Sequence, residues 1–483
     1  MSETHLRGWR VAPRVAVVVP EEDRPGWTDA ALWCALLDAW GVPAERASAA
    51  EVASQPWTTL IVPASIVDTG LVGGIAALDG AALLLVGAAT HDARGLEDRA
   101  GVTRFAPSAD DVVPATCEET VDAAERALGA AAPDGLVSIW RWPNGRDAAL
   151  VVDGDVDHPT GVDPECARYV APAIETARRA GFHAYGIFAA AANVDAEPTS
   201  FGPGADYYNH SYSHPYSHWS DDPWEALDGD RMRDELQRSN EAFRRHLGRD
   251  DQGIFRLPHF QLEAFDTTAE VLERLGYRAE SSIGGNHSVT GGLPFHPALR
   301  PWSARPADAP YARTHPDRSG RRLFLELPIS TDPTDGTFPN GCCSYNTLGE
   351  GVRNRTADPD AYERVLQEVL DRAVARRSLA HLFIDPPDAG YGRLLGDRPD
   401  YASAVERWLA RAVRRDDIAV MTTAELATWW LERELAVERL SLRLQDDVLV
   451  VDLPNAPEGA TLSALPPGGD GTWRRPRASE EVR

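Results

Sequence analysis

The sequence predicts an α/β protein whose main part, residues 136–435, is an irregular (β/α) barrel. Short apolar segments typical of buried parallel strands recur along this region, and amphipathic helical segments lie between several of them. Polar side chains follow the strand ends, where such barrels build their active sites. A small three-layer α/β domain (residues 1–135) is expected before the barrel, and a short β appendage with a disordered tail (residues 436–483) after it.

The N-terminal region alternates between strand and helix patterns. Residues 14–19, 58–62 and 81–86 are predicted strands, and Trp27–Trp40 is a predicted helix that ends at Gly41. This alternation predicts a parallel sheet with helices on both faces. The region resembles flavodoxin-like and glutamine-amidotransferase-like folds. Because it lacks a nucleophile elbow and a glycine-rich phosphate loop, we expect it to have a structural or oligomerising role.

The barrel region has eight predicted strands, at residues 148–152, 183–188, 206–209, 253–257, 277–282, 323–329, 379–384 and 418–422. The best amphipathic helices between them are residues 164–180, 224–247, 360–377 and 401–414. Two long connections, residues 284–321 and 330–356, are expected to be binding loops that set substrate selectivity. Residues 440–444 and 448–453 predict a β-hairpin, and the Gly- and Pro-rich composition after Pro466 predicts disorder.

The charge and composition of the chain limit its possible partners and its location. A net charge of −26 argues against nucleic acids and anionic membranes as partners and favours a neutral or cationic small molecule. The apolar run at residues 15–19 is too short for a signal peptide, and no later run could span a bilayer, so we expect a cytoplasmic protein without membrane contact. The five cysteines lack zinc spacing and suit a reducing compartment.

Three of the 13 histidines lie within nine residues, at His210, His214 and His218. His210 and His214 are four residues apart, so both rings can reach one metal ion. Pro215 disfavours a continuing helix, which predicts a strand end and a tight loop. Because no Glu follows His210, a general base must come from another part of the chain.

Three alternating carboxylates end the apolar run at residues 148–152: Asp153, Asp155 and Asp157. Alternate side chains of an extended chain point the same way, so Asp155 and Asp157 can share one pocket. One of them could bind a metal ion while the other acts as the base.

Together these segments resemble the polysaccharide deacetylase family, also called carbohydrate esterase family four or the NodB-homology domain. The motifs are Asp155-Val156-Asp157, the stretch from His210 to His214, and Arg256-Leu257-Pro258, in the family's order. The resemblance covers residues 136–435, whose family fold is a distorted barrel. It implies that Asp155 is the general base and that Asp157, His210 and His214 are the metal ligands. It also implies that Arg256 orients the catalytic carboxylate.

Two assignments stay open within this resemblance. The motif departs from the family's common Asp-Asp-Gly sequence, so Asp153 as base with Asp155 as ligand is the alternative register. If Asp155 is the base, Asp153 is expected to be a structural carboxylate. The family's general acid is a His in a late strand, and here the candidates are His381 inside the strand at residues 379–384 and Asp385 at its end. Both lie on the same face of that strand, and we favour His381 as the acid. A buried structural role for His381 is the alternative.

Three further residues are assigned lesser roles. His158 and His218 are expected to lie behind the ligands or to contact substrate, and a surface position is the alternative for His218. Ser281 follows the end of another predicted strand, at the same edge of the barrel as the motif residues.

These motifs predict a hydrolase of carbon–nitrogen bonds other than peptide bonds that removes an N-acetyl or related N-acyl group from a small soluble sugar or amine. The expected cofactor is a divalent metal, with zinc as first choice and Co, Ni, Mn or Fe as alternatives. The competing hypotheses are an allantoinase-like cyclic amide hydrolase, a catalytically idle carbohydrate-binding protein and a barrel glycosidase. The oligomeric state, homo-oligomers included, is left open.

Overall fold

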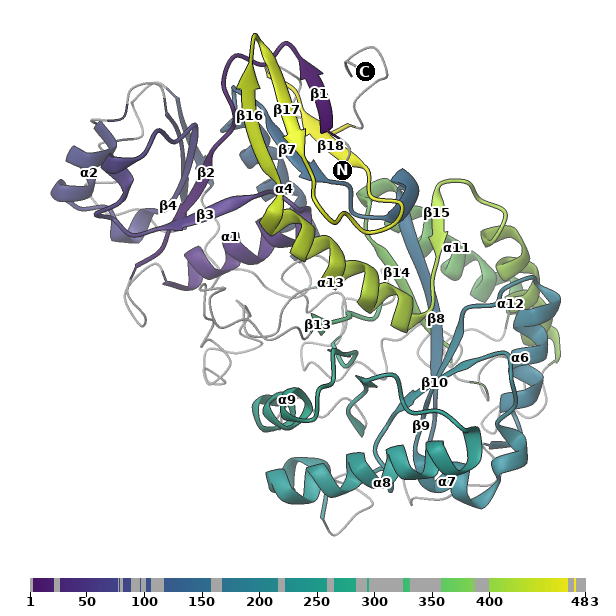
Figure 1. Ribbon diagram of the computed structural model, residues 1–483. Helices are drawn as coiled ribbons and strands as arrows, with labels where there is room; N and C mark the ends of the chain where they lie inside the picture. Colours follow the sequence, from purple (N-terminus) through teal and green to yellow (C-terminus); the bar gives the residue numbers. More distant parts are fainter. Residues whose placement is uncertain are drawn as a thin grey trace.

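The computed structural model (Figure 1) describes residues 3–20, 27–76, 78, 81–87, 96, 101–105, 117–157, 167–215, 222–258, 265–283, 293–294, 325–330, 358–384, 386, 399–467 and 473–474. The predicted selectivity loops at residues 284–321 and 330–356 lie outside these ranges, apart from residues 293, 294 and 330.

The N-terminal part is a parallel sheet of five strands between two helical layers. The strand order is β3-β2-β4-β5-β6, with bounds β2 (Val15–Val18), β3 (Ala44–Ala47), β4 (Thr59–Pro63), β5 (Ala82–Val86) and β6 (Val102–Phe105). One face packs on α1 (Trp27–Trp40) and α4 (Cys117–Ala130), and the other packs on α2 (Thr69–Ala76). The three predicted strands and the helix are present; which named three-layer fold this sheet belongs to stays a prediction.

The central part is a curled parallel sheet with a strand at each of the eight predicted positions. The strands are β8 (Ala148–Val156), β9 (Tyr185–Ala189), β10 (Asp206–Asn209), β11 (Ile254–Phe255), β12 (Ala279–Glu280), β13 (Leu325–Glu326), β14 (Leu379–Phe383) and β15 (Ile418–Val420). Their order is β13-β12-β11-β10-β9-β8-β14, and β15 pairs with the first half of β8. The Ser330 amide donates to the carbonyl of His381 at 2.8 Å, which links the chain after β13 to β14. The mixed α/β architecture with a barrel-like sheet is therefore confirmed.

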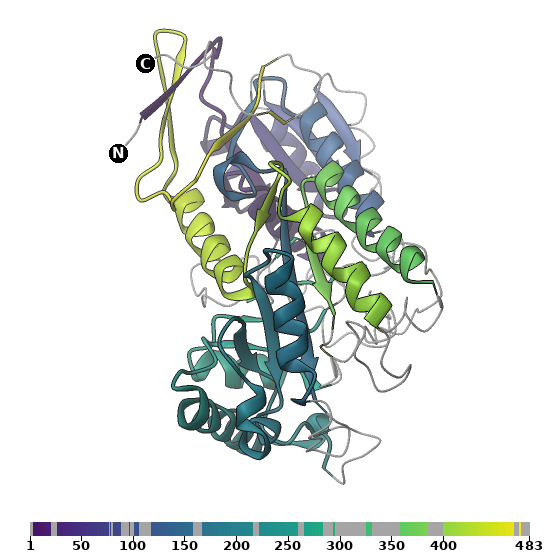
Figure 2. The same cartoon turned by 90° about the vertical axis from the view of Figure 1, so that its right-hand side faces the viewer.

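Helices cover the outside of this sheet. Apolar residues of α6 (Val170–Arg179), α11 (Pro359–Arg376) and α12 (Pro399–Ala412) pack on outward-facing side chains of β8, β9 and β14. Figure 2 shows these three helices side by side on one flank. Three further helices lie at the lower end of the molecule in Figure 1: α7 (Ala191–Ala196), α8 (Gly229–Leu247) and α9 (Phe265–Arg274). The Asp228 side chain caps the first turn of α8, and Gly248 ends the helix in a left-handed conformation.

A small β structure combines segments from distant parts of the chain. The predicted hairpin is present as β16 (Ser441–Gln445) and β17 (Val448–Asp452), and β1 (Glu3–Arg7) pairs with its second strand. β7 (Leu136–Ile139) pairs with β18 (Leu462–Leu465). The domain boundaries at residues 135 and 435 stay predictions, but β1 shows that the N-terminal segment extends this sheet.

Part of the segment expected to be disordered is placed. Trp473 is buried and Arg474 bridges to Ala464, so the prediction of a disordered tail is wrong at these two residues. The remaining residues beyond 467 lie outside the described ranges.

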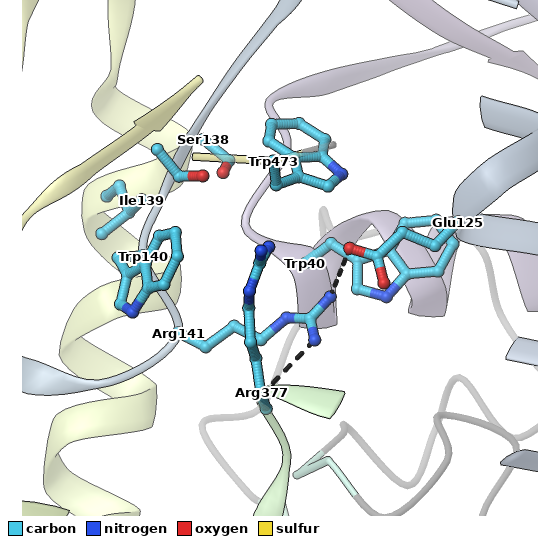
Figure 3. A pocket seen from close by; sticks show the side chains of 9 residues that line it. Trp40, Glu125, Ser138, Ile139, Trp140, Arg141, Arg377 and Trp473 are labelled. Atoms are coloured by element: carbon cyan, nitrogen blue, oxygen red, sulfur yellow. Dashed lines mark hydrogen bonds and ion pairs between the residues drawn. The ribbon is translucent and has the colours of Figure 1, made fainter. Parts of the chain in front are cut away.

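The N-terminal sheet and the barrel share one core. Apolar side chains of α1 and α4 belong to the same cluster as inward-facing residues of β8 and of α13 (Thr423–Arg439). Figure 3 shows the junction, where Arg141 pairs with Glu125 of α4 at 2.9 Å and donates to the carbonyl of Arg377, directly after α11, at 3.4 Å. Arg141 also donates to the carbonyl of Arg376, at the end of α11, at 3.0 Å. Arg433 of α13 is fully buried and donates to main-chain carbonyls at the end of β7 and to that of Asp38 in α1. The two parts are therefore fastened together by packing and by buried arginines.

No helix in the described parts of the chain has the length and apolar character needed to cross a bilayer.

Candidate active site

Asp157, His210 and His214 converge on one point at the C-terminal ends of β8 and β10. One ligand atom from each residue lies within 4.8 Å of the others. The Asp157 Oδ2 atom lies 3.2 Å from His210 Nε2 and 3.0 Å from His214 Nε2. Both histidines are buried, whereas the Asp157 side chain is 32% exposed, so the group is reached from one side.

The donor chemistry of this group fits a divalent metal ion. Nε2 of His214 faces the Asp157 carboxylate at 3.0 Å but makes no well-directed hydrogen bond within the described parts of the chain, although the ring is only 2% exposed. A buried polar nitrogen that is poorly satisfied is costly, and a cation bound between two imidazoles and a carboxylate would satisfy it. Two nitrogen ligands and one oxygen ligand leave further positions for water and substrate.

Arg256 orients the first histidine of this group through its main chain. The carbonyl oxygen of Arg256 lies 3.0 Å from His210 Nδ1. Metal-binding histidines commonly donate their second ring N–H to such an acceptor, which sets the tautomer and directs Nε2 at the metal. Arg256 follows β11, which neighbours β10 in the sheet, so strand pairing brings the carbonyl beside His210.

The Arg256 side chain joins the two acids that do not belong to the metal group. Its Nη1 lies 2.8 Å from Asp155 Oδ1, and its Nη2 lies 2.9 Å from Asp153 Oδ1. Nε donates to the carbonyl of Ser281 at 2.7 Å, and the Phe188 ring packs against the guanidinium at 3.8 Å. The arginine is fully buried, so these contacts hold it in one orientation.

Asp153 lies inside the barrel beneath this site. Besides Arg256, its carboxylate accepts from His381 Nε2 at 2.7 Å and from the Thr423 hydroxyl at 3.0 Å. Asp153 and His381 are both fully buried. Burial alone would raise the pKa of Asp153, but the charges of Arg256 and His381 outweigh it and lower the pKa to about 2. Asp153 is therefore an ionised structural group.

The pKa values of Asp155 and Asp157 are shifted in opposite directions. Burial, together with the charge of Asp157, raises the pKa of Asp155 although His210 and Arg256 oppose this shift. For Asp157, burial is outweighed by His214 and His210, which hold the pKa of its carboxyl well below the usual range. The environment thus separates a carboxyl that takes up a proton more readily from one that stays ionised.

The structure brings together most of the residues singled out in the sequence. Asp155, Asp157, His210, His214, Arg256 and Ser281 lie at one end of the barrel, and His381 lies deeper inside it. Asp385, His158 and His218 lie outside the described residues. Thr423, whose hydroxyl donates to Asp153, was not predicted from the sequence as a residue of this site. The capping box of Thr422 and Glu425 could have indicated it, because it marks the start of a helix directly after β15.

The comparison with protein families gives one match. Residues 180–279, which run from just before β9 to β12, match the family described as Polysaccharide deacetylase. The matched stretch contains His210, His214 and Arg256, and it confirms the resemblance inferred from the motifs. Over this stretch the barrel is similar to the NodB-type deacetylases, and this similarity supports a hydrolase of carbon–nitrogen bonds other than peptide bonds.

Solved structures show weaker likeness. A Mycobacterium smegmatis protein assigned as a polysaccharide deacetylase has 16% identity and a TM-score of 0.42, over 59% of this chain and 91% of its own. A mutant of the peptidoglycan deacetylase PdaC from Bacillus subtilis has 11% identity and a TM-score of 0.30, over 62% and 97%. Thermococcus litoralis 4-alpha-glucanotransferase has 11% identity and a TM-score of 0.34, over 59% and 40%. None of the curated proteins matched the chain.

Proposed function

We propose that this protein is a metal-dependent deacetylase that removes an N-acetyl or related N-acyl group from a small soluble sugar or amine-bearing metabolite. The observation that carries the proposal is the convergence of Asp157, His210 and His214 around one point, with Asp155 held beside them by Arg256. A carbohydrate-binding protein needs no base beside a metal group, and a barrel glycosidase needs no histidine pair.

In this proposal Asp157, His210 and His214 hold the metal, with zinc as first choice because two of the three ligands are nitrogens. Cobalt, nickel, manganese or iron could also occupy such a site. A bound divalent metal supplies a more acidic water and polarises the amide carbonyl.

Asp155 acts as the general base. Its Oδ2 lies 3.4 Å from His210 Nε2, and its Oδ1 is fixed by Arg256. A carboxyl with a raised pKa accepts a proton more readily than an ordinary one. This geometry favours the register in which Asp155 is the base and Asp157 the ligand. Asp153 is fully buried and bound by three side chains, which leaves it poorly placed to reach a substrate.

For the general acid we favour Asp385 over His381. His381 is fully buried, and its Nε2 is bound to Asp153, so we assign it to holding that carboxylate. Asp385 lies outside the described residues, but it follows β14 by two positions in the sequence, and barrel enzymes carry catalytic side chains directly after their strands.

The remaining parts of the proposal rest on sequence. The net charge of −26 favours a neutral or cationic substrate, and the five cysteines without zinc spacing suit a reducing location such as the cytoplasm. We infer that the N-terminal sheet, a flavodoxin-like or amidotransferase-like unit, has a structural role, because its core is continuous with that of the barrel.

The test is metal analysis of purified protein, paired with acetate release from a panel of N-acetylated sugars and amines. We expect near-stoichiometric metal in wild type and loss of both metal and activity in His210→Ala. The exposed His183→Ala is the matched control and should keep both. Metal-free protein that hydrolyses cyclic amides would replace the proposal with the allantoinase-like one, and metal-free, inert protein would favour a binding role.

A further inference from the structure

The loop that carries the two histidines, residues 210–214, has a strained backbone. Ser211 has a φ of 66° and His214 a φ of 51°, both in the left-handed region that side chains with a Cβ rarely adopt. Such conformations persist only where the surroundings hold them in place. The loop therefore needs anchors on both sides of its two strained residues.

Part of the anchoring comes from the loop and the residue before it. The Ser211 amide donates to Asn209 Oδ1 at 2.8 Å, and the His214 amide donates to the Ser211 hydroxyl at 3.0 Å. The Asn209 side chain is itself bound to Asp251 at 2.8 Å and to the Tyr277 hydroxyl at 2.7 Å. These bonds hold the first strained residue and link it to the second.

The middle of the loop is held by a carboxylate from another element. Glu235, in α8, accepts from the amides of Tyr212 at 3.0 Å and Ser213 at 2.8 Å, both on Oε2. Its Oε1 accepts from the Ser213 hydroxyl at 3.0 Å. Arg238, three residues further along α8, covers the Tyr212 ring at 3.9 Å and has Nη1 3.7 Å from Glu235 Oε1. Glu235 is 9% exposed, so water competes little for these bonds.

We propose that Glu235 is a positioning residue that sets the separation of the His210 and His214 imidazoles, whose ring centres lie 4.7 Å apart. Tyr212 and Ser213 lie between the two histidines, so fixing their amides fixes the path of the chain from one ring to the other. The inference rests on the proposed function, in which both rings bind one metal ion.

A glutamine at position 235 is the sharpest test because it keeps the size of the side chain. Glutamine can keep its single acceptor oxygen on the two amides, but it carries no charge, so both bonds become weaker neutral ones, and its NH₂ group would face the Ser213 hydroxyl and the Arg238 guanidinium. The charge-assisted hold on the loop is lost, while the packing of α8 is retained. Groups that orient metal ligands typically change metal affinity by about 10- to 100-fold when altered.

The experiment compares wild type, Glu235→Gln and Glu241→Gln, an exposed glutamate of the same helix. Zinc dissociation constants are measured by chelator competition, and the absorption spectrum of the Co²⁺-loaded protein reports ligand geometry. Hydrogen exchange of the Tyr212 and Ser213 amides is followed in metal-free protein. We expect Glu235→Gln to bind zinc about 10- to 100-fold more weakly, with a changed Co²⁺ spectrum and faster exchange. Glu241→Gln should match wild type.

Two results would overturn parts of this picture separately. If Glu235→Gln binds zinc within about twofold of wild type, with the same Co²⁺ spectrum, the positioning role is wrong although the metal site stands. If wild type binds neither zinc nor Co²⁺, the proposed function fails and the metal role of Glu235 fails with it. In that case the exchange rates still decide whether Glu235 orders the loop.

Discussion

Arg256 holds His210 through its main chain: the carbonyl oxygen of Arg256 lies 3.0 Å from His210 Nδ1. The guanidinium of the same residue lies 2.8 Å from Asp155. One arginine therefore aligns a metal ligand through its backbone and the proposed base through its side chain. Substitution of Arg256 keeps the backbone contact to His210 but removes the side-chain contact to Asp155. Mutants can therefore separate the effects of these two contacts.

Replacing Arg256 with lysine should lower kcat/KM by about 100-fold or more. A lysine cannot bridge two carboxylates with a planar fork, so Asp155 loses its fixed orientation. The loss of the pairing with buried Asp153 should also lower the free energy of unfolding by about 3 kcal/mol. Acetate-release kinetics and urea unfolding measure the two effects. Arg178→Lys, at an exposed pair with Glu175, should change neither.

Replacement by asparagine should have different effects on metal content at Asp155 and at Asp157. Asp155→Asn should keep its metal and lose activity by about 100- to 10,000-fold, as expected when a general base is removed. Asp157→Asn should lose metal, because it removes the only carboxylate of the metal group. The metal content and kcat of both variants together decide which aspartate is the base and which is the metal ligand. Metal loss in Asp155→Asn, with metal kept in Asp157→Asn, would favour the alternative in which Asp155 is the ligand.

Asp153 should make stability depend on acidity. Its pKa is lowered from 3.8 to about 2 in the folded protein. Because the folded value is the lower one, the stabilisation is complete above about pH 5 and is lost as the pH falls towards about 2. At about 1.4 kcal/mol per pKa unit, wild type should lose about 1 to 2 kcal/mol more than Asp153→Asn between about pH 5 and about pH 2.5. Chelator-treated protein and urea unfolding provide the measurement, and parallel losses in both proteins would contradict it.

Arg433 should help to fasten α1 of the N-terminal part to α13. Its guanidinium donates to the carbonyl of Asp38 in α1 at 3.5 Å, besides those of Ile139 at 3.0 Å and Trp140 at 3.2 Å, and it is fully buried. Arg433→Met keeps the apolar stem but leaves these carbonyls without donors, so the free energy of unfolding should fall by about 3 kcal/mol. The exposed Arg439→Met in the same helix is the control. Equal stability of the two variants would mean that Arg433 contributes nothing to the junction.

Much of the barrel and of the site could be predicted because the signals are local. Each of the eight strands overlaps a strand predicted from the sequence, and the metal group lies in two short motifs. These motifs come together because strand ends in a parallel barrel meet at one edge. The hairpin followed from two β-prone runs around a turn. Contacts between distant segments carried no such signal, as the pairing of β1 with β17 shows.

The sequence by itself determined which residues could bind a metal and act as a base, because residue type and short-range spacing define that chemistry. Only the tertiary structure decided that Asp153 is a buried structural anion, that His381 serves it, and that Glu235 holds the histidine loop. These roles depend on burial and on hydrogen bonds between residues far apart in the chain. Strand pairing and helix packing create this burial and these hydrogen bonds, and local periodicity in the sequence does not reveal them.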